Sequence, residues 1–376
     1  MANQLAEGRV REVFPGGNTS LGFYSYYDQI IAPDAARIMV IKGGPGVGKS
    51  SFMKAIATEM RLLGFDVELH HCASDNESLD GVVFPSISVA LIDGTSPHIV
   101  DPRNPGAVDE ILHLGDYWDE RALRQAKTEI MTLNQEVGRS FRRAYQYLKA
   151  AKVIHDDLEV IRQEGFRPGP ANQKSADLAA AIFAGCAISA TAGSLRKLFA
   201  SAITPEGFCN HLATLLDPCP TVYAIVGSPG SGKSSLISKI AAEAIGYGYD
   251  CEAFYCAFDP VKMEHLIIKD LNVALTTAVE PHRYDKRQFA GVMNMDECVD
   301  AAAIVPKYGG LIADEEALRA ALFQRAISFI GAAKALHDQM EQYYIPNMDF
   351  AAIAKLRDRT LERILGYAAE KQLISA

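Results

Sequence analysis

The sequence lacks the features that mark several large classes of protein. Its seven cysteines are odd in number and include no C-x-x-C pair, and no signal peptide precedes them, so we expect a reducing, cytoplasmic setting. Basic residues are not in excess, because the formal net charge is -9. A nucleic-acid backbone is bound through a basic face, and neither a helix-turn-helix, nor zinc-finger spacing, nor a basic aromatic platform is present. We therefore predict no nucleic-acid partner.

Long apolar runs are also scarce. The one uncharged stretch long enough to approach a bilayer span covers residues 178–195 and consists mostly of Ala, Gly, Ser and Thr, which gain little in lipid. We expect a buried or hinge helix there and no membrane partner, with a transmembrane helix as the alternative. The apolar fraction of 49% and charged fraction of 22% are those of a folded protein, and 376 residues are enough for two domains.

The most informative feature that is present is an internal repeat. The segment Gly43–Ser51 returns as Gly227–Ser235, 184 positions later, and the same offset holds for about fifty residues. Further downstream, a Lys-x-x-His-Asp-x-x-Glu pattern that begins at Lys152 returns at Lys334. The duplication spans nearly the whole chain, so we predict a first domain at 1–168, a linker at 169–196 and a second, diverged domain at 197–376.

Each copy contains the pattern G-x-x-x-x-G-K-S, which is the signature of a P-loop. In this motif backbone N–H groups and a helix N-terminus surround the phosphates of a nucleotide. The residues expected to bind nucleotide are Gly43, Gly44, Pro45, Gly46, Val47, Gly48, Lys49, Ser50 and Ser51 in the first copy, and Gly227, Ser228, Pro229, Gly230, Ser231, Gly232, Lys233, Ser234 and Ser235 in the second.

The surroundings of the first motif fit this interpretation. An apolar run at 37–42 leads into the glycines, and helical periodicity follows at 50–63. We further expect strands at 66–72 and 87–92 and a short helix at 77–83, which together indicate an α/β fold with a parallel sheet flanked by helices. The charged, helical segments 119–165 and 315–344 predict a helical hairpin in each of two tandem P-loop domains.

The chemistry expected at the first site centres on Mg-ATP. Lys49 would contact the β- and γ-phosphates, while Ser50, with Ser234 in the second copy, would ligate Mg²⁺. Asp93 ends an apolar run and takes the place of the Walker B carboxylate that holds the metal; an ordinary turn aspartate is the alternative. Thr277 stands at the matching position of the second copy, so we expect two unequal sites.

Three further residues are catalytic candidates because the repeat keeps them. Asp75 would act as an acceptor base, His98 as a γ-phosphate sensor or water-orienting group, and Arg103 as a cation that stabilises transferring charge. Structural alternatives stand beside each: a turn aspartate, a packing histidine, and a salt bridge to Asp101. The set Lys152, His155 and Glu159 shares one helix face, which suits either a ligand site or an interhelix contact.

The phrases at 16–23, 43–50, 70–76 and 91–98 resemble a poorly characterised bacterial family of tandem P-loop proteins, known mainly as ATP-binding proteins or ATPases. This resemblance implies nucleotide binding and names no substrate. The sequence contains no N-K-x-D guanine-reading motif and no L-S-G-G-Q transporter signature, so ATP is favoured over GTP.

Together these patterns predict a Mg-dependent P-loop NTPase that hydrolyses ATP at its first site and binds nucleotide or regulates at its second. Two alternatives stay open. One is a small-molecule or nucleotide kinase that uses Asp75 as acceptor base, and the other is a non-enzymatic, nucleotide-gated switch. Besides the nucleotide, the partner would be an unidentified small molecule or protein.

Overall fold

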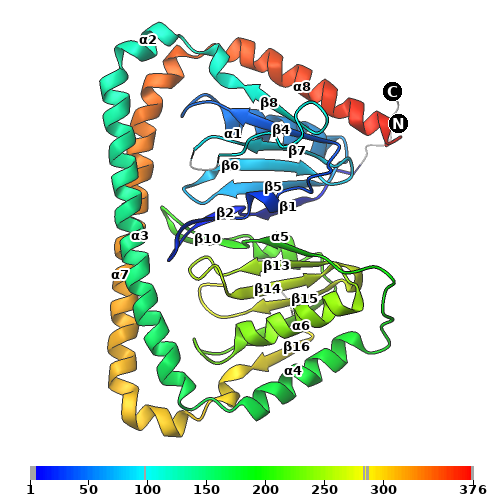
Figure 1. The fold of residues 1–376 in the computed structure, drawn as a ribbon, viewed down its shortest axis with the longest axis vertical. Coiled ribbons are helices and arrows are strands. Elements are labelled where there is room, and N and C mark those ends of the chain that lie inside the picture. The colour runs from blue at the N-terminus through cyan, green and yellow to red at the C-terminus, as the bar shows by residue number, and fades with distance from the viewer. Residues whose placement is uncertain (1–5, 97–98, 283, 285–287, 374–376) are drawn as a thin grey trace. The chain divides into compact units, whose positions relative to one another are not determined.

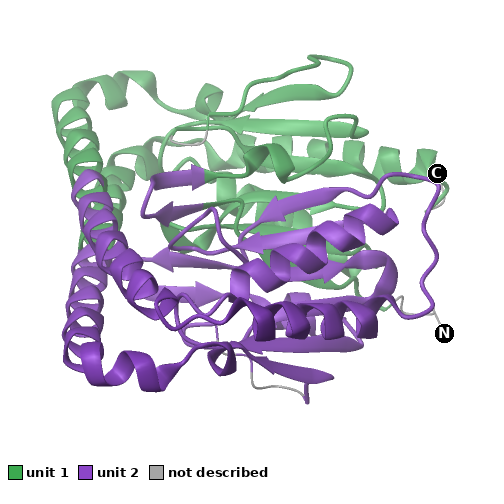
Figure 2. Cartoon of the chain, turned by 60° about the horizontal axis from the view of Figure 1, so that its bottom comes forward, with its two compact units in different colours: residues 1–16, 25–141, 329–376 green, residues 17–24, 142–328 purple. Residues whose placement is uncertain are grey.

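The computed structural model describes residues 6–96, 99–282, 284 and 288–373. The fold is α/β, as the sequence predicts, and the chain forms two compact units that are coloured separately in Figure 2. Unit 1 comprises Met1–Gly16, Ser25–Phe141 and Phe329–Ala376, and unit 2 comprises Gly17–Tyr24 and Arg142–Ser328. Each unit therefore draws on both halves of the sequence.

A six-stranded sheet forms the centre of unit 1, with the strand order β1-β5-β6-β7-β4-β8 (Figure 1). Strand β6 is antiparallel to both of its neighbours, while the remaining pairs are parallel. The predicted parallel sheet is thus corrected to a mixed one. The strands are β1 (Val10–Val13), β4 (Arg37–Lys42), β5 (Val67–Cys72), β6 (Asp75–Phe84), β7 (Val89–Asp93) and β8 (Asp109–His113).

The short helix predicted at 77–83 is wrong, because this segment lies in β6. A tight turn at 85–88 returns the chain directly into β7, and Ser88 adopts a φ of 57° there. The last six residues of β6 are all buried. A strand that is covered on both faces is a continuous apolar run, which hydrophobic periodicity does not distinguish from a buried helix.

The sheet of unit 2 repeats this arrangement, in the order β16-β12-β15-β14-β13-β9. Strand β14 takes the antiparallel place of β6. The duplication seen in the sequence therefore extends to strand order and direction. The strands are β9 (Leu195–Leu198), β12 (Thr221–Val226), β13 (Cys251–Tyr255), β14 (Met263–Ile268), β15 (Val273–Thr277) and β16 (Gly291–Asn294).

In each unit, one helix follows the glycine-rich segment of the P-loop pattern and packs on the sheet. In unit 1, α1 (Lys49–Leu62) buries Phe52, Met53 and Ile56 in a core that also includes Ile364 of α8 (Phe350–Glu370). In unit 2, α6 (Lys233–Tyr247) buries its apolar face together with α4 (Pro168–Phe183).

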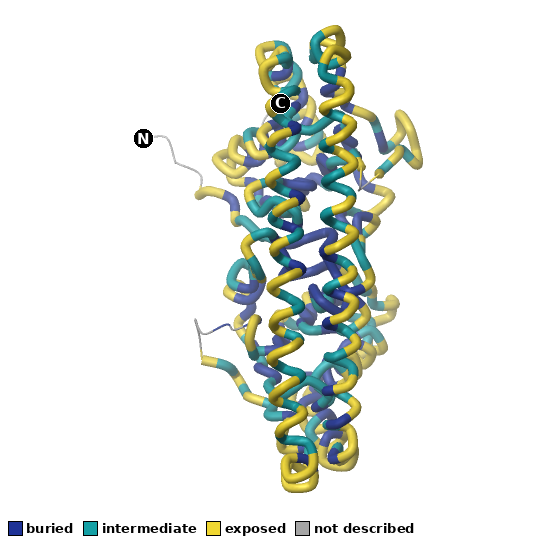
Figure 3. Tube along the Cα trace, turned by 90° about the vertical axis from the view of Figure 1, so that its left-hand side faces the viewer, coloured by how far each residue is buried: buried dark blue, intermediate teal, exposed yellow. Residues whose placement is uncertain are grey.

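The predicted helical hairpins are replaced by two long single helices, α3 (Lys127–Gln163) and α7 (Ala301–Tyr344). The short α2 (Glu120–Gln125) precedes α3. A hairpin needs a turn, and between 127 and 163 the sequence has no proline and only one glycine. Exposed residues recur along both helices (Figure 3), and the buried residues of α3 share one side at helical spacing, among them Ala144, Leu148 and Ala151.

The units also depart from the predicted division at 168 and 196. The segment predicted as a linker begins with α4, whose Leu178 and Ile182 belong to the core of unit 2. Helix α3 contributes 127–141 to unit 1 and 142–163 to unit 2, while α7 contributes 329–344 to unit 1. In the part of the chain that the structure describes, no helix combines the length and the apolar character that a bilayer-spanning helix requires.

The remaining elements are short. Two hairpins, β2-β3 and β10-β11, form two-stranded sheets. Their bounds, with those of α5 and the 3-10 turns, are Gly16–Thr19 (β2), Gly22–Ser25 (β3), Ser201–Thr204 (β10), Gly207–Asn210 (β11), Leu212–Leu216 (α5), Tyr27–Gln29, Leu114–Tyr117, Lys269–Leu271, Met295–Cys298 and Ile345–Asn347.

Candidate functional site

The first glycine turn, residues 43–48, joins β4 to α1 in unit 1. Gly46 and Gly48 have φ angles of 64° and 88°, so both lie in the left-handed region that favours glycine. Gly48 is the N-cap of α1, which begins at Lys49. The turn therefore delivers the chain into a helix N-terminus, where backbone N–H groups without helical partners are available to an anion.

Lys49 and Asp93 meet beside this turn. The Lys49 ammonium donates to the carbonyls of Gly43 (3.2 Å) and Gly44 (2.9 Å) and lies 3.6 Å from Asp93 Oδ2. Asp93 ends β7, which is parallel to β4 with Ile41 opposite Asp93. Burial raises the pKa of Asp93, while the Lys49 charge lowers it. The two predicted residues thus come together because their strands are neighbours.

A second carboxyl group lies near this pair and was missed by sequence reasoning. Asp80 is 4% exposed, and burial raises its pKa to about 6 against hydrogen bonds from Tyr27 and Cys72. The β5-β6 register shifts so that His70 pairs with Gly81 and His71 with Leu79, which leaves Asp80 in a β-bulge. Bulges re-aim side chains and recur next to active sites.

The C-terminal part of α7 covers the first glycine turn. Glu341 Oε1 accepts a hydrogen bond of 3.1 Å from the Gly46 N–H. About two helical turns before Glu341, Lys334 lies 3.6 Å from Asp75 and also donates to Asp338. The repeated Lys-x-x-His-Asp-x-x-Glu pattern of the second copy is therefore part of the site that the first copy's glycines form.

The second glycine turn, residues 227–232, has the same form in unit 2. Gly230 and Gly232 have φ angles of 79° and 94°, and α6 begins at Lys233. The Lys233 ammonium donates to the carbonyls of Gly227 (2.7 Å) and Ser228 (2.8 Å). Thr277 ends β15 at the position that Asp93 holds in unit 1 and is 3% exposed.

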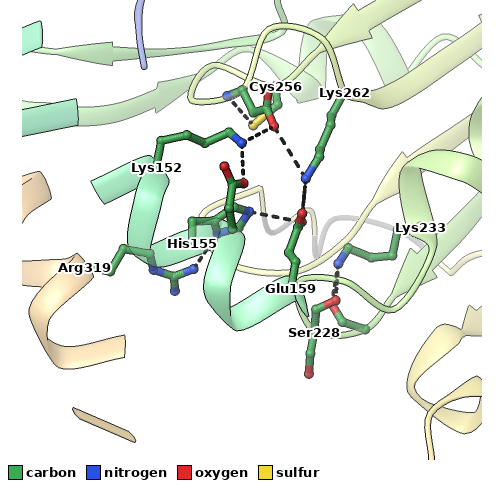
Figure 4. Close-up of polar contacts among 11 residues, drawn as sticks. Lys152, His155, Glu159, Ser228, Lys233, Cys256, Lys262 and Arg319 are labelled. Carbon is green, nitrogen blue, oxygen red and sulfur yellow. Dashed lines mark hydrogen bonds and ion pairs between the residues drawn. The ribbon is translucent and has the colours of Figure 1, made fainter. Parts of the chain in front are cut away.

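The helix pattern of the first copy lies at this second turn, as Figure 4 shows. Lys152 on α3 lies 3.3 Å from Asp259, and Lys262 donates to Glu159 at 2.6 Å. Glu159 is also 3.3 Å from His155. Burial raises the pKa of Glu159, but the hydrogen bonds and charges of His155 and Lys262 outweigh it and lower the pKa to about 2.

The two sites differ at Lys262 of the second copy, because the first copy has no lysine at the corresponding position. Lys262 corresponds to Ser78 in the first copy, and Ser78 donates to Asp75 instead. Glu159 is consequently held by a cation in unit 2, whereas in unit 1 the corresponding Glu341 bonds to the glycine turn itself. The difference between Lys262 and Ser78 is visible when the sequences of the two copies are compared.

Some predicted residues are not brought to the turns. Arg103 is exposed and donates through its backbone N–H to Asp109, and the alternative salt bridge with Asp101 is also not seen, because Asp101 pairs with Lys42 at 2.9 Å. Asp75 is the first residue of β6 and accepts hydrogen bonds from the Ser78 hydroxyl and the Glu77 N–H. His98 lies outside the described residues. Ser50 does reach the site region, where its Oγ accepts from the Leu79 N–H at 3.0 Å.

Comparisons of the chain with models of known protein families, with curated proteins and with solved structures found no match.

Proposed function

We propose that the chain is a Mg-dependent, ATP-binding P-loop NTPase with two nucleotide sites. The observation that carries this proposal is the first site: a left-handed glycine turn ends at a helix N-terminus, with the Lys49 ammonium 3.6 Å from the carboxylate of Asp93. A cradle of N–H groups, a cation and a metal-directing carboxylate are the three parts that polyphosphate binding requires. The resemblance of the sequence to tandem P-loop proteins implies the same class, that of ATP-binding proteins.

In this proposal the turn at 43–48 binds the phosphates, Lys49 contacts the β- and γ-phosphates, and Ser50 and Asp93 hold Mg²⁺. The magnesium ion supplies charge neutralisation on the phosphate oxygens. In hydrolysis a water oxygen bonds to the γ-phosphorus while the bond to the β–γ bridging oxygen breaks, which yields ADP and inorganic phosphate. Asp80 is the buried carboxyl placed to influence the charge of the Asp93–Lys49 pair.

The second site has the same turn but a different charge arrangement. Thr277 provides no carboxylate, whereas Lys262 adds a cation next to Glu159. We therefore assign turnover to the first site and binding or regulation to the second.

A nucleotide-gated switch is the second candidate, and one contact favours it. The Glu341 carboxylate accepts the Gly46 N–H that a phosphate oxygen would use. A nucleotide must displace this internal anion, and the displacement would move the end of α7. For a kinase that uses Asp75 as base, the structure offers no comparable feature, since Asp75 is engaged by Lys334 and Ser78.

The test uses Lys49→Ala, Lys233→Ala and the double variant. Calorimetric titration with Mg²⁺ and a non-hydrolysable ATP analogue should give two bound nucleotides for the natural chain, one for each single variant and none for the double variant. Phosphate release should fall by about 100-fold or more in Lys49→Ala and far less in Lys233→Ala. Lys54→Ala, on the exposed side of α1, is the matched control.

Absence of nucleotide binding by the natural chain contradicts the whole proposal. Equal losses of phosphate release in the two single variants contradict the unequal roles of the sites. Binding of nucleotide without any phosphate release selects the switch.

A further inference from the structure

Unit 2 contains a buried group of metal-ligating side chains that the proposed function does not use. Glu264, His265 and His282 each place one ligand atom within 4.8 Å of the others. His265 is 1% exposed and His282 is 4% exposed. Two imidazoles and a carboxylate in such a small buried volume form a donor set that divalent transition metals prefer, whereas Mg²⁺ prefers oxygen ligands.

A β-bulge explains how two consecutive residues reach the same point. Successive side chains in a regular strand point to opposite faces. In the β13-β14 pair, however, Phe254 pairs with His265 and Tyr255 with Met263, so Glu264 is the extra, unpaired residue. The bulge interrupts the alternation and lets the side chains of Glu264 and His265 converge with His282.

The hydrogen bonds of His265 leave one ring nitrogen available. His265 Nδ1 is hydrogen-bonded to Thr276 Oγ1 at 2.8 Å, whereas its Nε2 is buried without a hydrogen-bond partner among the described residues. A metal-bound histidine commonly has this arrangement, because a bond from the other nitrogen fixes the ring and its tautomer. An unpartnered nitrogen in the protein interior is otherwise costly.

A simple buried ion pair accounts for only part of the group. Glu264 Oε2 and His282 Nε2 are 3.1 Å apart, but within the described part of the chain that oxygen has no partner with hydrogen-bond geometry. The ion pair also leaves His265 Nε2 unexplained.

We propose that Glu264, His265 and His282 bind one divalent transition metal of the Zn²⁺ type. The first copy cannot build the same site, because Asp80 and Gly81 stand at the positions of Glu264 and His265. The expected stoichiometry is therefore one metal per chain.

The experiment uses the full chain with its affinity tag removed, because a polyhistidine tag binds the same metals. After dialysis against a chelator, Co²⁺ is added and the visible absorption of tetrahedral cobalt is followed, with metal content measured after gel filtration. The natural chain should hold one equivalent. His265→Gln and His282→Gln should each weaken binding by more than about 10-fold.

His113→Gln is the matched control, because His113 is an exposed histidine of unit 1 that pairs with Asp116. It should bind cobalt as the natural chain does. Should the buried variants fail to fold, X-ray absorption on the natural chain loaded with Zn²⁺ decides instead, since imidazole scattering is expected. Failure of the natural chain to retain one equivalent, or unchanged binding in both histidine variants, overturns the proposal.

Discussion

At the scale of single residues, Asp80 is the group whose charge state is most sensitive to the fold. Its pKa is raised by burial to about 6 from an ordinary value of 3.8. Between these two values the folded chain holds a proton that the unfolded chain has lost, so stability should fall as pH rises from about 4 to 6. The difference corresponds to about 3 kcal/mol once Asp80 is ionised.

Asp80→Asn should therefore stabilise the protein at pH 8 and have little effect near pH 4, as measured by urea unfolding at both values. Asp66→Asn is the control with the opposite sign, because hydrogen bonding to Arg9 lowers the pKa of Asp66. That substitution should destabilise the protein at pH 8. A destabilised Asp80→Asn variant at pH 8 would show that the ionised carboxylate is favourable in the fold.

The chemistry of single residues was partly readable from the sequence. Spacing placed Lys49 and Asp93 at one end of neighbouring strands, where the structure has them. Asp80 and Glu264 were missed although both are acidic and 184 positions apart. Their positions depend on bulges, and a bulge changes pairing by one residue without a signal in hydrophobic periodicity.

At the scale of elements, the long helices are where prediction and structure differ most. Helical periodicity predicted helical hairpins at 119–165 and 315–344 in place of the single helices α3 and α7, and local sequence does not state which glycine turn a long helix will reach. Only the three-dimensional path shows that Glu341 lies on the turn at 43–48 and Glu159 beside the turn at 227–232. The repeat pattern was therefore recognised while its placement was not.

The contact between α7 and the first glycine turn predicts the effect of Glu341→Gln. The carboxylate occupies the Gly46 N–H and repels incoming phosphate, and a hydrogen bond to a charged group is worth about 1.5–3 kcal/mol. Glutamine should tighten ATP-analogue binding at the first site by about 10-fold, measured by titration in the Lys233→Ala background. Glu362→Gln, exposed on α8, should change nothing, and weaker binding in Glu341→Gln would assign Glu341 to the bound state instead.

At the scale of the whole molecule, the two copies of the sequence are not the two compact units. Unit 1 takes residues 329–376 from the second copy, and unit 2 takes 17–24 and 142–168 from the first together with the predicted linker. The predicted boundaries at 168 and 196 assume that each copy folds on its own helices. Sequence duplication identifies the repeated parts, but it does not show how the parts are exchanged between units.

This exchange predicts the result of cutting the chain between its copies. The loop between α4 and β9, residues 184–194, is mostly exposed, so a protease site can be introduced near residue 190. After cleavage the fragments should elute together in native gel filtration and separate only in denaturant. Unit 1 would otherwise lose Ile353 and Ile364 of α8, which are 6% and 0% exposed, at about 1.5–3 kcal/mol for each buried side chain.

The alternative outcome is equally clear. If each sequence copy formed its own domain, the two fragments would separate in native buffer and both would keep their helical circular dichroism. The role of α8 can be checked by removing 349–376 from the second fragment, because that truncation takes away Ile353, Ile364 and Ala368 from the core of unit 1. The fragments should still elute together through α4 in the core of unit 2, but unit 1 should unfold at a lower urea concentration, since the apolar face of α1 is left uncovered.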